Sequence, residues 1–103
     1  MDEMTRKQVA DSLARLSEQS EWNPEIWQRC HDLVQANWAD ELLGYVYDDL
    51  VHYSGVFDSY NLLGIRVKPN QNELEHYRQE FRDIATALGL GLSLSEAKQK
   101  FEL

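Results

Sequence analysis

The chain has 103 residues, of which 43% are hydrophobic, 11% aromatic and 27% charged, and its formal net charge is -8. This length suits one small domain, residues 1–103, and the aromatic content argues against disorder because the chain can bury enough apolar surface to offset its ordering entropy. Residues 1–51 carry 11 acidic and 4 basic side chains, whereas residues 52–103 carry 7 and 6. The acidic half would repel a phosphate backbone, which argues against direct nucleic-acid binding and favours a basic protein partner, although the same charge also promotes solubility.

Cys30 is the single cysteine, so no internal disulfide can form, as is typical of proteins in the reducing cytoplasm. The opening residues MDEMTRKQVADS lack the apolar stretch of a signal peptide. No apolar run approaches the roughly 18 residues that a membrane span needs. We therefore expect a cytoplasmic protein with no membrane partner.

Two helices are predicted in the first third of the chain. Thr5 followed by Gln8 resembles a capping box, and the apolar residues that follow at helical spacing predict a helix over about 5–19. Asn23, followed by proline, is a strong start signal because asparagine caps and proline at the first helical position loses only an unpaired N–H. It begins a helix over about 24–36.

The middle of the chain predicts a third helix and a loop. Residues 37–40, Asn-Trp-Ala-Asp, can cap a helix that ends near Ser54, with Gly55 directly after its C-terminus. One long helix over 24–54 is the alternative. The stretch 55–72 contains glycine and proline and breaks the helical pattern, which predicts one long ordered loop.

The last third of the chain predicts two more helices. Asn72 with Glu75 resembles another capping box, and apolar residues at spacings of 3, 4, 3 and 4 predict an amphipathic helix over about 73–88. Ser93 with Glu96 begins a last short helix. The predicted fold is therefore all-α, a compact bundle of four to five helices with one long ordered loop.

The stretch GYVYDDLVHYSGVF, residues 44–57, combines tyrosines and acids with the apolar residues of the third helix. At about 100° per residue, four polar side chains form one outward stripe, whereas Tyr53 falls in the core and Trp38 and Asp49 fall on the border of the apolar face. A half-exposed tyrosine beside carboxylates is typical of binding hot spots, although a solvated helix face has the same composition. The stripe consists of Glu41, Tyr45, Asp48 and His52.

Two aromatic residues that follow the stripe have alternative interpretations. Phe57 and Tyr60 lie in the predicted loop, where they either plug the open end of the bundle or extend the stripe into a larger exposed patch. The predicted partner-binding residues are therefore Glu41, Tyr45, Asp48, His52, Phe57 and Tyr60.

Catalytic and metal-binding patterns are weak. Asp49 and Glu73 each begin an acid-x-x-His-Tyr segment, a spacing that di-metal helical bundles use, but the helical geometry directs both His52 and His76 to water. We therefore expect no internal metal site and no cofactor. Cys30 falls on an apolar helix face and is interpreted as a small core residue. The chain has no glycine-rich phosphate loop, CxxC or HExxH motif, which argues against an enzyme.

The function that these features favour is a small acidic non-enzymatic protein-binding module of the inhibitor, immunity or adaptor type. It would use its acidic, tyrosine-bearing helix face against a basic protein surface. The alternatives are a DNA-mimic protein, and a metal-binding or half-site enzyme acting as a homodimer. Arg78 and Arg82 are too sparse for a nucleic-acid patch and are expected on the solvated surface.

Overall fold

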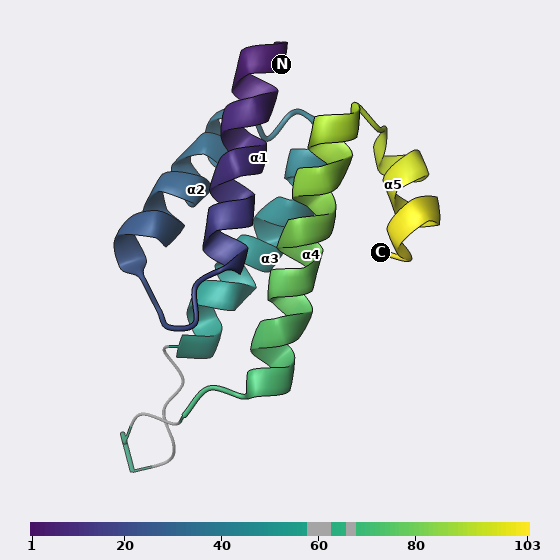
Figure 1. Ribbon diagram of the computed structural model, residues 1–103. Helices are drawn as coiled ribbons and strands as arrows, with labels where there is room; N and C mark the ends of the chain where they lie inside the picture. Colours follow the sequence, from purple (N-terminus) through teal and green to yellow (C-terminus); the bar gives the residue numbers. More distant parts are fainter. Residues whose placement is uncertain (58–62, 66–67) are drawn as a thin grey trace.

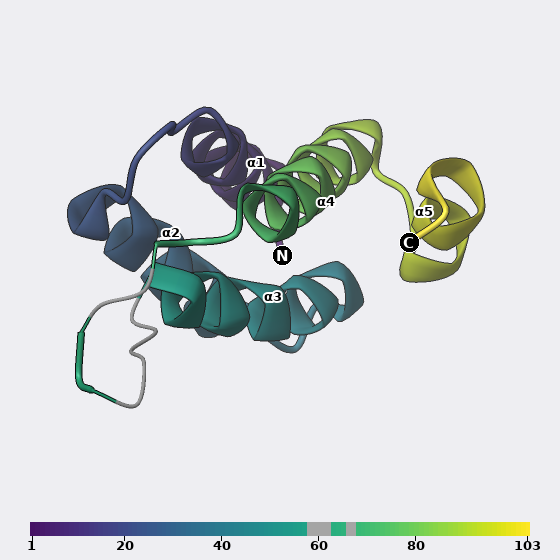
Figure 2. The ribbon, with the colours of Figure 1, turned by 90° about the horizontal axis from the view of Figure 1, so that it is seen from below.

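Five helices in chain order make up the fold of the computed structural model, which describes residues 1–57, 63–65 and 68–103. The first four run alternately down and up (Figure 1), with α1 beside α4 in one layer and α2 beside α3 in the other (Figure 2). The fifth lies beside α4, outside the four-helix core. The described residues contain no strand, so the predicted all-α fold is confirmed. The helices are α1 (Glu3–Ser17), α2 (Pro24–Ala36), α3 (Glu41–Phe57), α4 (Gln71–Leu90) and α5 (Leu94–Phe101).

The core lies between the two layers, where each long helix packs against two neighbours: α1 and α3 both contact α2 and α4. Apolar residues at helical spacing on α1, α2, α3 and α4 form this core, as the sequence periodicity predicts. Tyr53 and Phe81 are the largest fully buried side chains, and their rings meet edge to face with 5.3 Å between centroids. Such an edge-to-face pair adds to the hydrophobic gain of burying both rings, and it joins α3 to α4.

Two helices begin earlier than predicted because a different polar residue provides each cap. Asp2 caps α1 by accepting the N–H of Thr5 at 2.7 Å, so Thr5 lies inside the helix. Asn70 caps α4 by accepting the N–H groups of Asn72 at 2.9 Å and Glu73 at 3.1 Å, so the predicted cap at Asn72 is also wrong. Each pair of candidates offers a short acceptor side chain within one turn, and local sequence does not distinguish them.

The predicted caps of α2 and α5 are confirmed, and α2 and α3 are separate helices. Asn23 accepts the N–H of Ile26 at 3.2 Å, and Ser93 and Glu96 form a reciprocal capping box. Residues 37–40 interrupt the helical path, so the alternative of one long helix is wrong. Asp40 provides the cap of α3, because its Oδ1 accepts the N–H groups that follow in the first turn.

The end of α3 lies at Phe57, one turn past the predicted end at Ser54, and Gly55 belongs to the helix. Val56 and Phe57 are buried and extend the apolar face, and their packing against the core stabilises the extra helical turn. Phe57 packs against Trp22 of the α1–α2 connection, with 5.0 Å between ring centroids. It therefore plugs the end of the bundle, and its alternative placement in an exposed patch is wrong.

The predicted loop lies partly outside the described residues. Residues 58–62 and 66–67 are not described, and Tyr60 is among them. None of the helices in the part of the chain that the structure describes combines the length and apolar character needed to cross a lipid bilayer.

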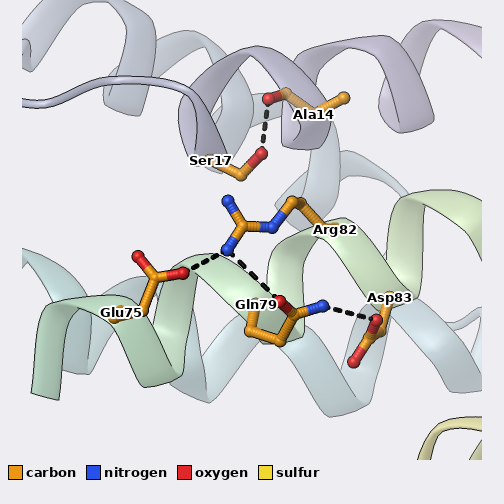
Figure 3. Close-up of polar contacts among 6 residues, drawn as sticks. All are labelled: Ala14, Ser17, Glu75, Gln79, Arg82 and Asp83. Carbon is orange, nitrogen blue, oxygen red and sulfur yellow. Dashed lines mark hydrogen bonds and ion pairs between the residues drawn. The ribbon is translucent and has the colours of Figure 1, made fainter. Parts of the chain in front are cut away.

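The two arginines of α4 occupy different environments. Arg82 donates to Glu75 and, at 3.3 Å, to Gln79, which in turn donates to Asp83 at 3.0 Å (Figure 3). Arg82 is thus a surface residue in local polar contacts, as predicted. Arg78 is buried, and its guanidinium donates at 3.3 Å to a backbone carbonyl of the α1–α2 connection. The surface placement predicted for Arg78 is therefore wrong, since it holds this connection against α4.

The cap at Asp40 leads to a stability prediction. Asp40→Ala removes the acceptor of two backbone N–H groups, and we expect the free energy of unfolding to fall by about 1 kcal/mol. Urea denaturation followed by circular dichroism measures the change. Asp11→Ala, an exposed position within α1, is the matched control and should shift stability by less than about 0.5 kcal/mol. Equal effects of the two substitutions would contradict the capping role.

Candidate functional site

The polar residues of α3 divide into two groups, because the helix packs against α2 and α4 and leaves only part of its circumference exposed. One group faces α4 and α5, and the other faces solvent. The predicted stripe is split between them. The inward group is Glu41, Tyr45 and Asp49, and the outward group is Tyr47, Asp48, Val51 and His52.

Tyr45 has an internal partner. Its hydroxyl donates to Glu80 Oε1 on α4 at 2.6 Å, and Lys98 Nζ of α5 lies 5.6 Å from the centroid of its ring. Burial, followed by the contact with the Glu80 carboxylate, raises the pKa of Tyr45 above its usual value. The ring is half-buried as predicted, but its polar end joins α3 to α4.

Asp49 lies one turn after Tyr45, half-buried and facing the same Glu80, which is only 8% exposed. Burial, together with hydrogen bonding to Glu80 and repulsion from its charge, raises the pKa of Asp49 to about 7. Two ionised carboxylates cannot bond to each other, and Asp49 Oδ2 is buried with no partner among the described residues. A proton on Asp49 resolves this conflict by making it a donor to Glu80.

Two further contacts lie along the inward side of α3 and α4. One is between His76 and Glu80, and the other is between Glu41 and the start of α5. His76 Nε2 lies 3.8 Å from Glu80 Oε2, with its side chain 73% exposed. Glu41 Oε1 accepts the N–H of Leu94 at 2.9 Å and so ties the first turn of α5 to the start of α3. The inward group can take up a proton and stabilises helix packing. Its members already have partners within the chain, because Tyr45 and Asp49 contact Glu80 and Glu41 accepts the N–H of Leu94.

The outward group begins beside an exposed tryptophan, since Trp38 lines one hollow with Tyr47 and Asp48. Asp48 and His52 are exposed, as predicted, and Val51 between them is 43% exposed. Trp38 is 68% exposed, although the sequence placed it on the border of the core. It lies in the turn between α2 and α3, where helical periodicity does not apply. Trp38, Tyr47, Asp48, Val51 and His52 are called the α3 surface below.

The segment of the chain that carries the α3 surface is acidic. The sequence has no lysine or arginine between Arg29 and Arg66. The carboxylate of Asp48 makes no hydrogen bond or ion pair with any residue that the structure describes. An unpaired carboxylate beside exposed aromatic rings can attract and hold a cationic group.

Metal binding and thiol chemistry find little support in the geometry. In residues 1–57, 63–65 and 68–103, no three His, Cys, Asp or Glu side chains come together in a way that could hold a metal ion. His52 and His76 are both exposed, as predicted. Cys30 is fully buried, and burial raises the pKa of its thiol to about 12, so the thiol stays protonated at neutral pH.

A comparison of the chain with protein-family models, curated proteins and solved structures finds no match. The function is therefore inferred from the geometry and charge of α3 and its neighbours.

Several residues of the site, among them Glu80, Trp38 and Tyr47, were missed by sequence reasoning. Glu80 directly precedes the core residue Phe81, and no pattern within α4 marks Glu80 as buried. The available signal was on α3, where Tyr45 and Asp49 are four residues apart and so must face the same neighbour. Tyr47 was not part of the predicted stripe, and its place in the α3 surface depends on Trp38, which precedes the first turn of the helix.

The carboxyl pair gives a pH-dependent prediction. The pKa of Asp49 is about 7 in the folded protein against 3.8 for the ordinary carboxyl, so the folded state holds a proton that the unfolded state releases. Its contribution to stability is therefore present below about pH 4 and lost as the pH rises through about 7. Asp49→Asn keeps a neutral donor to Glu80 at every pH, so we expect the variant to gain stability over the wild type across this window.

Urea denaturation at intervals from pH 4 to 8 measures the difference. Asp11→Asn is the matched control, because it removes the same charge from an exposed site on α1. Its stability should stay parallel to that of the wild type. If the stability of Asp49→Asn also ran parallel to that of the wild type from pH 4 to 8, Asp49 would titrate normally in the folded protein, which would contradict the prediction.

Proposed function

We propose that the chain is a non-enzymatic protein-binding module that uses the α3 surface against a basic surface of a partner protein. The observation that carries the proposal is Trp38, an indole that is 68% exposed at the end of an acidic helix face. Exposing a tryptophan leaves a large apolar area in water, and tryptophan is among the residues that most often dominate binding energy at interfaces. A reducing cytoplasm would suit the buried single thiol of this module.

The composition of the α3 surface supports a protein partner. Trp38 and Val51 supply apolar area, Tyr47 supplies a half-buried ring, and Asp48 supplies a charge with no partner among the described residues. An apolar centre with a charged rim is the usual anatomy of a protein interface. The lack of basic residues between Arg29 and Arg66 favours a basic partner, because complementary charge accelerates encounter and penalises acidic competitors.

DNA mimicry explains the same surface less well. A mimic of the phosphate backbone needs carboxylates spaced along a face, and it has no use for an exposed indole and an exposed valine. A protein partner uses both the Asp48 carboxylate and the apolar residues. DNA mimicry remains distinguishable by experiment, since added duplex DNA would displace the partner of a mimic.

The binding proposal predicts the effect of charge reversal on one face. The wild-type protein is immobilised to isolate a partner from a lysate of the source cells, and the purified partner is then titrated against variants by calorimetry. Asp48→Lys should weaken binding at least tenfold, about 1.4 kcal/mol, because it places a like charge against the basic partner. Trp38→Ala should weaken it by about 2 kcal/mol or more.

Asp11→Lys is the matched control, because it changes the net charge by the same amount at an exposed site on α1, which packs on α2 and α4. It should alter affinity by less than about threefold, a long-range effect of net charge. If the three variants bind as the wild type does, the assignment of the α3 surface is wrong. If the two charge reversals weaken binding equally, net charge acts without a defined surface.

A further inference from the structure

A hollow in the α3 surface has the lining of a cation site. Its volume is about 400 Å³, which is at the lower end of the range for small-ligand sites. It lies where α2 ends and α3 begins, and its lining combines two aromatic rings, one carboxylate and one amide. The lining residues are Gln35, Trp38, Gly44, Tyr47 and Asp48.

Gly44 keeps this hollow open. A Cβ atom at Gly44 would lie 3.1 Å from the backbone oxygen of Trp38, which is closer than ordinary van der Waals contact. The backbone N–H of Gly44 donates to the Asp40 carbonyl at 2.8 Å, which is the first helical hydrogen bond of α3. A larger residue here would press on the backbone at Trp38 and take up part of the hollow that Gly44 lines.

The polar groups of the hollow are unpaired within the described part of the chain. Neither the Asp48 carboxylate nor the Trp38 indole N–H has a hydrogen-bond partner there, and the lining contains no lysine or arginine. Aromatic faces attract cations, and a carboxylate accepts charge-assisted hydrogen bonds from a guanidinium in a paired geometry. The chemistry of the lining is therefore complementary to a planar cation.

We propose that the hollow binds an arginine side chain of the basic partner, with the guanidinium against the rings of Trp38 and Tyr47 and its N–H groups donating to Asp48. This inference rests on the proposed protein-binding function and adds to it the residue type that is recognised. Arginine fits better than lysine, because its planar group stacks on aromatic rings, donates to both oxygens of one carboxylate and is more weakly hydrated. The Gln35 amide oxygen provides a further acceptor at the edge.

The test is a titration with N-acetyl-arginine-methylamide, a capped arginine, followed by the indole ¹⁵N–¹H signals of the three tryptophans. Trp38→Phe identifies the Trp38 signal by its loss. We expect a saturating shift of this signal, with the backbone amides of Tyr47 and Asp48 shifting together. The capped citrulline, a neutral analogue of the same shape, should give no saturating shift. Capped lysine should bind at least about threefold more weakly than capped arginine.

Asp48→Asn keeps the shape of the side chain and should weaken the binding of capped arginine by about fivefold, which equals about 1 kcal/mol. Asp11→Asn on α1 is the matched control and should leave the affinity unchanged. Equal binding of arginine and citrulline, or no change in Asp48→Asn, would overturn the inference. A Trp38 signal that does not move with capped arginine would overturn it as well.

These outcomes are independent of those that decide the proposed function. If capped arginine fails to bind while Asp48→Lys still weakens the partner complex, the module stands and the arginine site is wrong. If capped arginine binds at the hollow but the partner complex ignores both Asp48→Lys and Trp38→Ala, the hollow recognises arginine and the partner uses another surface.

Discussion

The hydrogen bond between Tyr45 and Glu80, with Asp49 held against the same carboxylate, fixes which side of α3 faces the rest of the bundle. These groups occupy the α3–α4 interface, where a buried polar atom without a partner costs roughly 1–3 kcal/mol. A rotation of α3 would break the tyrosine bond and leave Glu80 buried without its donor. Apolar packing alone tolerates small rotations of a helix, whereas this polar contact accepts one orientation.

The orientation of α3 decides which carboxylates remain available to a partner. Asp48 and Asp49 are adjacent in sequence, yet one is exposed and unpaired within the described residues and the other is half-buried beside Glu80. Their side chains diverge by about 100° on the helix, so a single choice of buried face separates them. Below about pH 7, a proton on Asp49 also keeps a second negative charge out of the helix interface, and the negative field of α3 is then concentrated on its outer side.

Sequence periodicity predicts the fold and only part of the site, for a physical reason. Burial repeats along each helix, so the all-α bundle and the core positions around Tyr53 and Phe81 follow from one-dimensional spacing. The positions of α2 and α4 around α3 are set by tertiary packing, and no repeat in the sequence of α3 records them. Tyr45 and Asp48 share a predicted stripe, but α4 lies against one and solvent against the other. Trp38 escapes the pattern entirely, because it lies in a turn whose path depends on the cap at Asp40.

That turn links the architecture of the bundle to its candidate binding site. Asp40 ends the α2–α3 connection by capping α3, and Gly44 lets the backbone at Trp38 approach the new helix closely. The indole is therefore presented on a backbone that two helices hold in place, which reduces the entropy lost when a partner binds it. A longer or looser connection would leave the same aromatic residue mobile. The shortness of the turn and the absence of a side chain at Gly44 together hold the backbone of the exposed Trp38 close to α3.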